Sequence, residues 1–285
     1  MSTLKPVDHH TRQQLNDHLA QIEQALEGDV ITIIAPMVHG LDLLVKRGLE
    51  LFENKRPRLI VILDTLGGVV EVVERMVVSM RHHYDEVYFV IPDRAMSAGT
   101  VFAMSGDKIY MNYFSCLGPI DPQIEKDGKL VPALAYLVQF RRLSEKADAG
   151  NLNTAEYTLL GKLDLGELHQ FEQAKELSHD LLVEWLSNYK FKDWMTHSST
   201  GDPVTDEEKR ERANAVASDL NNNERWHSHG RSIFRDTLVN EIRLKIDNLE
   251  GVDGLNPALD EYFGLLKDYM AREALQNFIH TREYF

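Results

Sequence analysis

The sequence predicts an α/β fold with a parallel β-sheet core, flanking helices and helical additions. Three apolar runs rich in β-branched residues, at residues 29–36, 58–64 and 85–92, have the length and composition of buried strands. Helical patterns separate them: "LDLLVKRGLELFENKRP" precedes the second run and "GGVVEVVERMVVSMRHH" follows it. An alternation of strands and helices predicts parallel strands joined by right-handed crossovers.

Length, charge and cysteine content narrow the class of protein. The chain has 285 residues, of which 43% are hydrophobic, enough for a sizeable core. The formal net charge is -14 and no basic stripe can neutralise phosphates, so no nucleic-acid partner is expected. The single cysteine, Cys116, allows no internal disulfide and fits a reducing compartment. The N-terminal segment lacks the apolar core of a signal peptide, and no apolar run approaches the ~18 residues that span a bilayer; we therefore expect a cytoplasmic protein without a membrane partner.

Further helical segments surround the predicted sheet. Residues 1–27 are expected to form an N-terminal helical segment, and residues 28–250 the main domain. Within that domain, residues from about 133 to 220 form a helical insertion. Residues 251–285 form a C-terminal helical tail, which the pattern predicts to be one more amphipathic helix with an apolar stripe.

Two turns at the predicted carboxyl ends of the strands carry the residues best suited to chemistry. "DTLGG" follows the second strand, and "DRAMSAGT" follows the third, so Ser97 opens the next helix. The free N–H groups of a helix start can stabilise a developing oxyanion, which makes the N–H of Ala98 one candidate donor. The Gly67-Gly68 pair lets the backbone approach a ligand closely and is the candidate for the second donor. Taken alone, such a serine can equally be a packing residue, and such a glycine pair a simple turn.

Three motifs in order, "LDTLGGVVEVVERM", "RAMSAGTVFAMSGDKIYM" and "GPIDPQI", resemble those of the Clp-protease and crotonase-like superfamily. The chain most closely resembles its serine dehydrogenase proteinase branch, related to signal peptide peptidases of the SppA type, over roughly residues 28–250. The resemblance implies a ClpP/crotonase-like sheet, a nucleophilic Ser97, and an oxyanion hole made by Gly67, Gly68 and Ala98. It also implies rings or stacks of identical subunits, to which we expect the C-terminal helix to contribute.

A nucleophilic serine needs a base, and the sequence offers several candidates. Clp proteases place a histidine after the next strand, but the corresponding "LGPIDPQI" has none. Enzymes of the SppA type use a lysine, which must be desolvated to be neutral near pH 7. Lys126 and Lys129 lie among acidic residues that keep a lysine protonated, and Lys146 is more simply a surface residue.

The serine dehydrogenase proteinases are described with the order serine, aspartate, histidine, and the chain can supply that order. Asp121 lies in "GPIDP", where a carboxylate held by a stiff turn can orient an imidazole, although it can also be an ordinary turn residue. His229, just before Gly230 in "WHSHGRSI", matches the family's late histidine better than His227, which competes for the same role.

The predicted function is therefore a serine peptidase, or related amide or ester hydrolase, that acts on peptides or proteins as a homo-oligomer. No cofactor or metal is expected, since the chain has no HExxH or CxxC spacing and no full GxGxxG fingerprint. Two alternatives remain open at this stage. The missing early histidine and the long helical additions suggest a non-catalytic peptide-binding or assembly protein of the same fold. A crotonase-like acyl-CoA enzyme would use the same backbone donors to stabilise an enolate.

Overall fold

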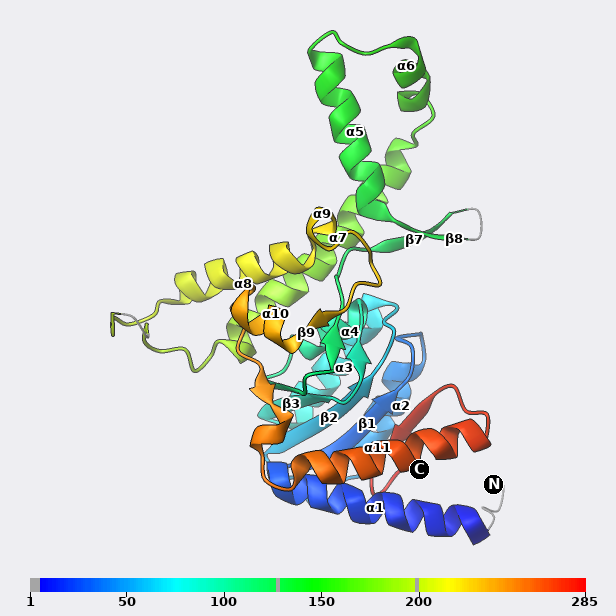
Figure 1. The fold of residues 1–285 in the computed structure, drawn as a ribbon, viewed down its shortest axis with the longest axis vertical. Helices are drawn as coiled ribbons and strands as arrows, with labels where there is room; N and C mark the ends of the chain where they lie inside the picture. Colours follow the sequence, from blue (N-terminus) through cyan, green and yellow to red (C-terminus); the bar gives the residue numbers. More distant parts are fainter. Residues whose placement is uncertain (1–5, 127–128, 198–199) are drawn as a thin grey trace.

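The computed structural model describes residues 6–126, 129–197 and 200–285, and its centre is a mostly parallel β-sheet (Figure 1). Within these residues the order of strands in the sheet is β10-β5-β3-β2-β1-β11. The strands are β1 (Asp29–Ile34), β2 (Arg58–Asp64), β3 (Glu86–Ile91), β5 (Lys108–Met111), β10 (Asp247–Asn248) and β11 (Phe278–His280). Neighbouring strands are parallel except for β1 and β11, which are antiparallel. The predicted α/β class with a parallel sheet is confirmed.

The central strands end together at one edge of the sheet. Helix α2 (Leu41–Glu50) connects β1 to β2, and α3 (Val70–His83) connects β2 to β3. The register places Ile34 beside Asp64 and Ile62 beside Val90. The turns that follow β2 and β3 therefore emerge at the same edge, as a parallel sheet requires. We call this edge the carboxyl edge and the opposite one the amino edge.

Helices cover both faces of the sheet, so the central strands β1, β2 and β3 consist mostly of buried apolar residues. Ile31 and Val61 point toward α2 and α3, whereas their neighbours Val30 and Ile60 point to the other face. That second face is covered by α1 (Pro6–Leu26) and α11 (Leu255–Arg272), which lie side by side in Figure 1. No helix in the described part of the chain is long and apolar enough to cross a membrane.

The helical insertion follows a short hairpin of β7 (Gln123–Lys126) and β8 (Lys129–Pro132). Its elements are α5 (Ala133–Asp148), α6 (Thr154–Leu160), α7 (Leu165–Trp185), the π-helical turn η1 (Leu186–Lys190), α8 (Asp206–Leu220) and α9 (Asn223–Trp226). Helices α7 and α8 pack together beside the sheet, whereas α5 and α6 project away from it at the top of Figure 1. The chain then returns through α10 (Arg235–Asn240) and the 3-10 turn η2 (Leu249–Gly251).

The expectation that the C-terminal tail is a single helix is wrong. Helix α11 ends at Arg272, and β11 then adds an antiparallel strand beside β1. His280 holds this strand in the core: its Nδ1 lies 2.8 Å from the Tyr262 hydroxyl, and its Nε2 lies 3.1 Å from Oδ1 of Asn16. Burial lowers the pKa of His280 to about 3, so the ring stays neutral. A helical pattern could not reveal this because β11 is specified by contacts with distant segments.

The apolar stripe of α11 is also buried within the chain. Tyr262 and Leu266 are fully buried, and Met270 is 6% exposed, against α1 and the second face of the sheet. These residues of the stripe therefore belong to the chain's own hydrophobic core, and a contribution of the helix to contacts between subunits stays a prediction.

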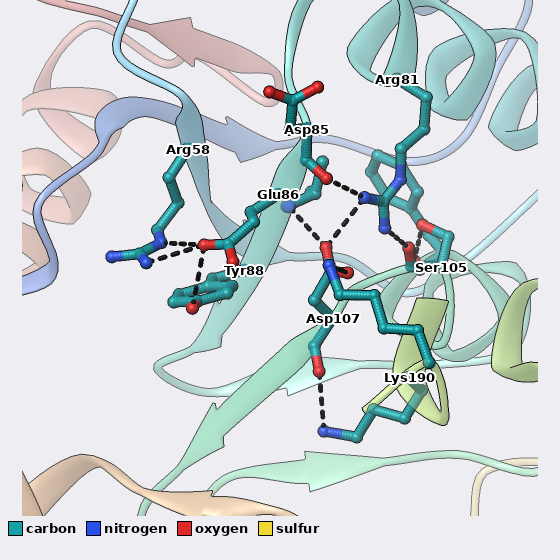
Figure 2. A network of polar contacts seen from close by, with 11 residues as sticks. Arg58, Arg81, Asp85, Glu86, Tyr88, Ser105, Asp107 and Lys190 are labelled. Carbon is teal, nitrogen blue, oxygen red and sulfur yellow. Dashed lines mark hydrogen bonds and ion pairs between the residues drawn. The ribbon is translucent and has the colours of Figure 1, made fainter. Parts of the chain in front are cut away.

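Paired charges occupy the amino edge of the sheet (Figure 2). Oε2 of Glu86 accepts a hydrogen bond from Nε of Arg58 at 2.7 Å, on the first residues of two adjacent strands. Burial opposes ionisation of Glu86, but the hydrogen bond from Arg58 and its positive charge outweigh this and lower the pKa of the carboxyl group. Oδ2 of Asp107 accepts from Arg81 at 2.8 Å and from the backbone N–H of Val87 at 2.7 Å. This edge is thus closed by hydrogen bonds and ion pairs.

Candidate active site

Ser97 occupies the turn between β4 (Arg94–Ala95) and α4 (Ala98–Ala103), at the carboxyl edge. Its backbone angles are φ 53° and ψ -120°, which a residue with a side chain rarely adopts. Such a conformation costs on the order of 1–3 kcal/mol and clusters at functional sites. The same kind of strained strand-to-helix turn exposes the nucleophile of α/β-hydrolases. Ser97 is partly buried, and its hydroxyl forms no hydrogen bond with the described residues.

The two predicted glycines are required by close contacts. A Cβ atom on Gly67 would lie 2.6 Å from the carbonyl oxygen of Met96 and 2.8 Å from Cβ of Ser97. A Cβ atom on Gly68 would lie 2.4 Å from the carbonyl oxygen of Met37. Both glycines also have positive φ, at 94° and 145°. Gly67 therefore lets the glycine turn lie directly against Ser97, and Gly68 lets it lie against the end of β1.

Two backbone donors are unpaired beside Ser97. The N–H of Met37 donates to the carbonyl oxygen of Gly67 at 2.9 Å, and the N–H of Val69 donates to the carbonyl oxygen of Met37 at 2.7 Å. These two hydrogen bonds involve the residues before and after Gly68 and leave the N–H of Gly68 itself unused. Among the described residues, the N–H groups of Gly68 and Ala98 donate to no protein acceptor. Ala98 is only 4% exposed, and a buried N–H without a partner is uncommon in proteins. Two free donors near a serine can hold an oxyanion.

A second, small sheet at the carboxyl edge joins three distant segments. Its strands, in spatial order, are β4 (Arg94–Ala95), β6 (Cys116–Leu117) and β9 (Ile233–Phe234). The register places Ala95 beside Leu117, and Leu117 beside Ile233. The segments that carry the candidate serine, aspartate and histidine therefore run side by side, although they span more than a hundred residues of sequence.

The segment that carries Ser97 and the segment that leads to Asp121 are also in direct contact. The Thr100 hydroxyl accepts a hydrogen bond from the N–H of Gly118 at 2.9 Å and lies 2.7 Å from the carbonyl oxygen of Ala95. A Cβ atom on Gly118 would lie 2.6 Å from Cε of Met96. The strand leading to Asp121 thus lies in contact with the turn that holds the serine.

Asp121 and His229 meet directly. Nδ1 of His229 lies 2.8 Å from Oδ1 of Asp121, whose side chain is 1% exposed, while the imidazole is 25% exposed. A buried carboxylate bound to Nδ1 fixes the orientation of an imidazole and leaves Nε2 for proton transfer. His227 is exposed, has a φ of 62° and ends α9. Of the two candidate histidines, His229 is the one that contacts Asp121.

Of the three candidate lysines, the structure describes the side chain of Lys146. Nζ of Lys146 is paired with Glu156, within the projecting pair of helices α5 and α6. The side chains of Lys126 and Lys129 lie outside what the structure describes.

Two residues at this site were not predicted from the sequence. Oδ2 of Asp121 accepts hydrogen bonds from Nε2 of Gln123 and from Nδ2 of Asn223, each at 3.0 Å. A weak indication of Gln123 was present in the sequence, because it stands two residues after the candidate Asp121. No indication of Asn223 was present, because it is one of three consecutive asparagines about a hundred residues after Asp121.

Comparison with known families identifies the family of this chain. The model of the ClpP-like SDH-type serine proteinases matches residues 45–222, more than half of the chain. The chain belongs to this family. The matched range includes Ser97 and Asp121 and ends before His229. Family membership confirms the resemblance seen in the motifs and supports a serine peptidase.

Two curated relatives are the uncharacterized proteins MJ0137 and MJ1495 of Methanocaldococcus jannaschii. The chain is 29% identical to the first over 163 residues, which are 53% of this chain and 50% of the relative. It is 27% identical to the second over 140 residues, 45% of this chain and 46% of the relative. The chain thus spans about half the length of the curated relatives that it matches.

Similar solved structures include two of the 1510-N membrane-bound stomatin-specific protease. One mutant of that protease is 19% identical, and the match covers 50% of this chain and 74% of the other with a TM-score of 0.33. A second mutant, in complex with a substrate peptide, is 22% identical, and the match covers 42% of this chain and 59% of the other with a TM-score of 0.33.

Proposed function

We propose that this chain is a serine peptidase with Ser97 as nucleophile, His229 as general base and Asp121 as the carboxylate that orients the imidazole. The observation that carries the proposal is the contact between Ser97 and the glycine turn. There, a strained serine lies against Gly67 and is flanked by the unpaired N–H groups of Gly68 and Ala98. The Asp121–His229 hydrogen bond, on the segment aligned by the small sheet, supports the choice of base.

The first half of the reaction follows from these roles. Oγ of Ser97 forms a bond to the carbonyl carbon of a peptide, and its proton passes to Nε2 of His229. The N–H groups of Gly68 and Ala98 hold the oxyanion, an interaction for which each donor typically contributes ~10²–10³ in rate. The C–N bond then breaks, and His229 returns the proton to the leaving amine.

The second half regenerates the enzyme. A water molecule attacks the acyl-serine ester while His229 takes one of its protons, and the ester bond to Ser97 breaks with return of that proton to Oγ. No residue changes its net protonation over the cycle.

The substrate class, assembly and compartment are parts of the same proposal. We expect a peptide or protein substrate, because the family consists of serine proteinases. A homo-oligomer and a cytoplasmic location are expected as well, and the mass of the purified chain, measured by light scattering, tests the first of these.

Labelling with a fluorophosphonate tests the catalytic roles without knowledge of the substrate. We expect a covalent adduct on Ser97, no adduct in Ser97→Ala, and a rate at least about 10³-fold lower in His229→Ala. His227→Ala is the matched control, because His227 does not contact Asp121, and it should label at close to the wild-type rate. Absence of an adduct on wild-type Ser97, while a control hydrolase reacts, would contradict the peptidase and favour a non-catalytic peptide-binding protein.

A further inference from the structure

The Asp121 carboxylate is more tightly held than a catalytic pair alone requires. Asp121 is fully buried, and its side chain accepts three hydrogen bonds from side chains. Oδ1 accepts from His229 at 2.8 Å, and Oδ2 accepts from Gln123 and Asn223 at 3.0 Å each. An ionised carboxylate only accepts hydrogen bonds, so each carboxamide must present its NH₂ group to it. The two oxygens therefore have separate tasks: one binds the imidazole, and the other is fixed by amides.

Asn223 contributes from a part of the chain that is distant in sequence. It is the first residue of α9, where the helical insertion returns to the core. The N–H of Ile120 donates to the carbonyl oxygen of Leu220 at 3.1 Å, which holds this return beside the Asp121 segment. The neighbouring Asn222 has a different task, since its side chain caps α9 by accepting from the N–H of Arg225 at 3.0 Å.

We infer that Asn223 is a positioning residue for the reaction, which holds Asp121 in the rotamer that orients His229. The inference rests on the proposed function and deepens it. Gln123 and Asn223 share the task of holding Oδ2; with Gln123 alone, rotation of the carboxylate about its Cβ–Cγ bond is less restricted, and the direction of the imidazole is less well fixed. Hydrogen bonds to Oδ2 prevent that rotation. The helical insertion is in this way part of the catalytic apparatus, because it ends in the residue that fixes the buried carboxylate.

The test compares two adjacent asparagines in the full chain. We expect Asn223→Ala to lower the second-order rate of fluorophosphonate labelling at Ser97 by about 10-fold to 100-fold, the range typical of groups that orient a functional side chain. Asn222→Ala is the matched control: it removes the cap of α9 but leaves the contact with Asp121, so labelling should stay near the wild-type rate. Rates are measured well below the melting temperature of each variant, so that only folded protein is compared.

An isosteric variant separates positioning from packing. Asn223→Leu preserves the approximate volume of the side chain but has no donor for Asp121. Asn223→Asp places a second carboxyl group beside the buried Asp121, where the two groups share one proton and the shared proton restores a hydrogen bond. We therefore expect Asn223→Leu to label as slowly as Asn223→Ala, and Asn223→Asp to label faster than both. A role in packing alone would leave Asn223→Leu near the wild-type rate.

The outcomes distinguish this inference from the proposed function. Labelling of the wild-type chain at Ser97, combined with wild-type rates in Asn223→Ala and Asn223→Leu, overturns the positioning role and leaves the peptidase standing. Equal losses in Asn222→Ala and Asn223→Ala also overturn it, since they would assign the effect to helix α9 as a whole. Failure of the wild-type chain to label at Ser97 overturns the peptidase itself.

Discussion

The two edges of the central sheet differ in how their polar groups are satisfied. At the amino edge, Asp107 binds Arg81 at 2.8 Å and Glu86 binds Arg58 at 2.7 Å, so charged groups are paired (Figure 2). At the carboxyl edge, the N–H groups of Gly68 and Ala98 have no partner among the described residues, and Ser97 has a positive φ. At the amino edge these charged side chains stabilise the fold by pairing with one another. At the carboxyl edge two backbone N–H groups remain free to bind a ligand, and the backbone of Ser97 is strained.

The difference follows from the direction of the strands. A parallel sheet collects all strand starts at one edge and all strand ends at the other. Turns from adjacent strand ends therefore converge, and they supply donors to a common point at which ligands bind in such folds. The strand starts have no such convergence of helix N-termini and can be closed by ion pairs. We therefore expect damage at the carboxyl edge to affect reactivity and damage at the amino edge to affect stability.

The largest effect is expected for Gly67→Ala. The added Cβ would collide with Met96 O and with Cβ of Ser97, which displaces the glycine turn from the serine. Fluorophosphonate labelling should fall by about 10³-fold, as expected when oxyanion donors move out of place. The control is Gly40→Ala: Gly40 has a similar φ of 96° but open space around it, so this variant carries the backbone strain without the collision. A similar loss of labelling in both variants would contradict the role of the contact.

Asp107→Ala tests the opposite edge. Its removal leaves the buried guanidinium of Arg81 without its carboxylate and the N–H of Val87 without an acceptor. The free energy of unfolding, measured with urea, should fall by about 3–5 kcal/mol, while the labelling rate of the folded protein stays unchanged. Glu86→Ala is the milder control, because its pair with Arg58 is partly exposed and should contribute about 1 kcal/mol or less. A strongly reduced labelling rate in folded Asp107→Ala protein would contradict the expectation that the amino edge affects stability and not reactivity.

The smallest effect concerns Lys190, whose Nζ reaches the carbonyl oxygen of Asp107 at 3.5 Å (Figure 2). Burial lowers the pKa of this lysine from 10.5 to about 8, although the charge of Asp247 acts in the opposite direction. Between these values the unfolded chain binds more protons than the folded one, so stability rises as pH increases from 8 toward 10. We expect a gain on the order of 2 kcal/mol over this range, and Lys190→Met should remove it. Urea unfolding at pH 8, 9 and 10 measures both, and an identical pH dependence in the two proteins would contradict the assignment.

Predictability from sequence also differs along the chain. The strands at residues 29–36, 58–64 and 85–92 could be predicted because their apolar composition reflects burial on both faces. The turn residues Gly67 and Ser97 could be named because a parallel sheet places strand ends together. In contrast, β11 was missed because a short strand at the sheet margin depends on its pairing with β1 and on the buried contacts of His280.

The sequence by itself determined the α/β class and the family, and it named the candidate serine and glycine turn, because each depends on local patterns and on the order of motifs. Only the tertiary structure decided which histidine meets Asp121, and that Gln123 and Asn223 fix the other carboxylate oxygen. The spacing of Asn223 and His229 from Asp121 could not show this, since these residues are brought together by strand pairing and by burial of the helical insertion. Hydrogen bonds between residues a hundred positions apart are a property of the folded core rather than of any local segment.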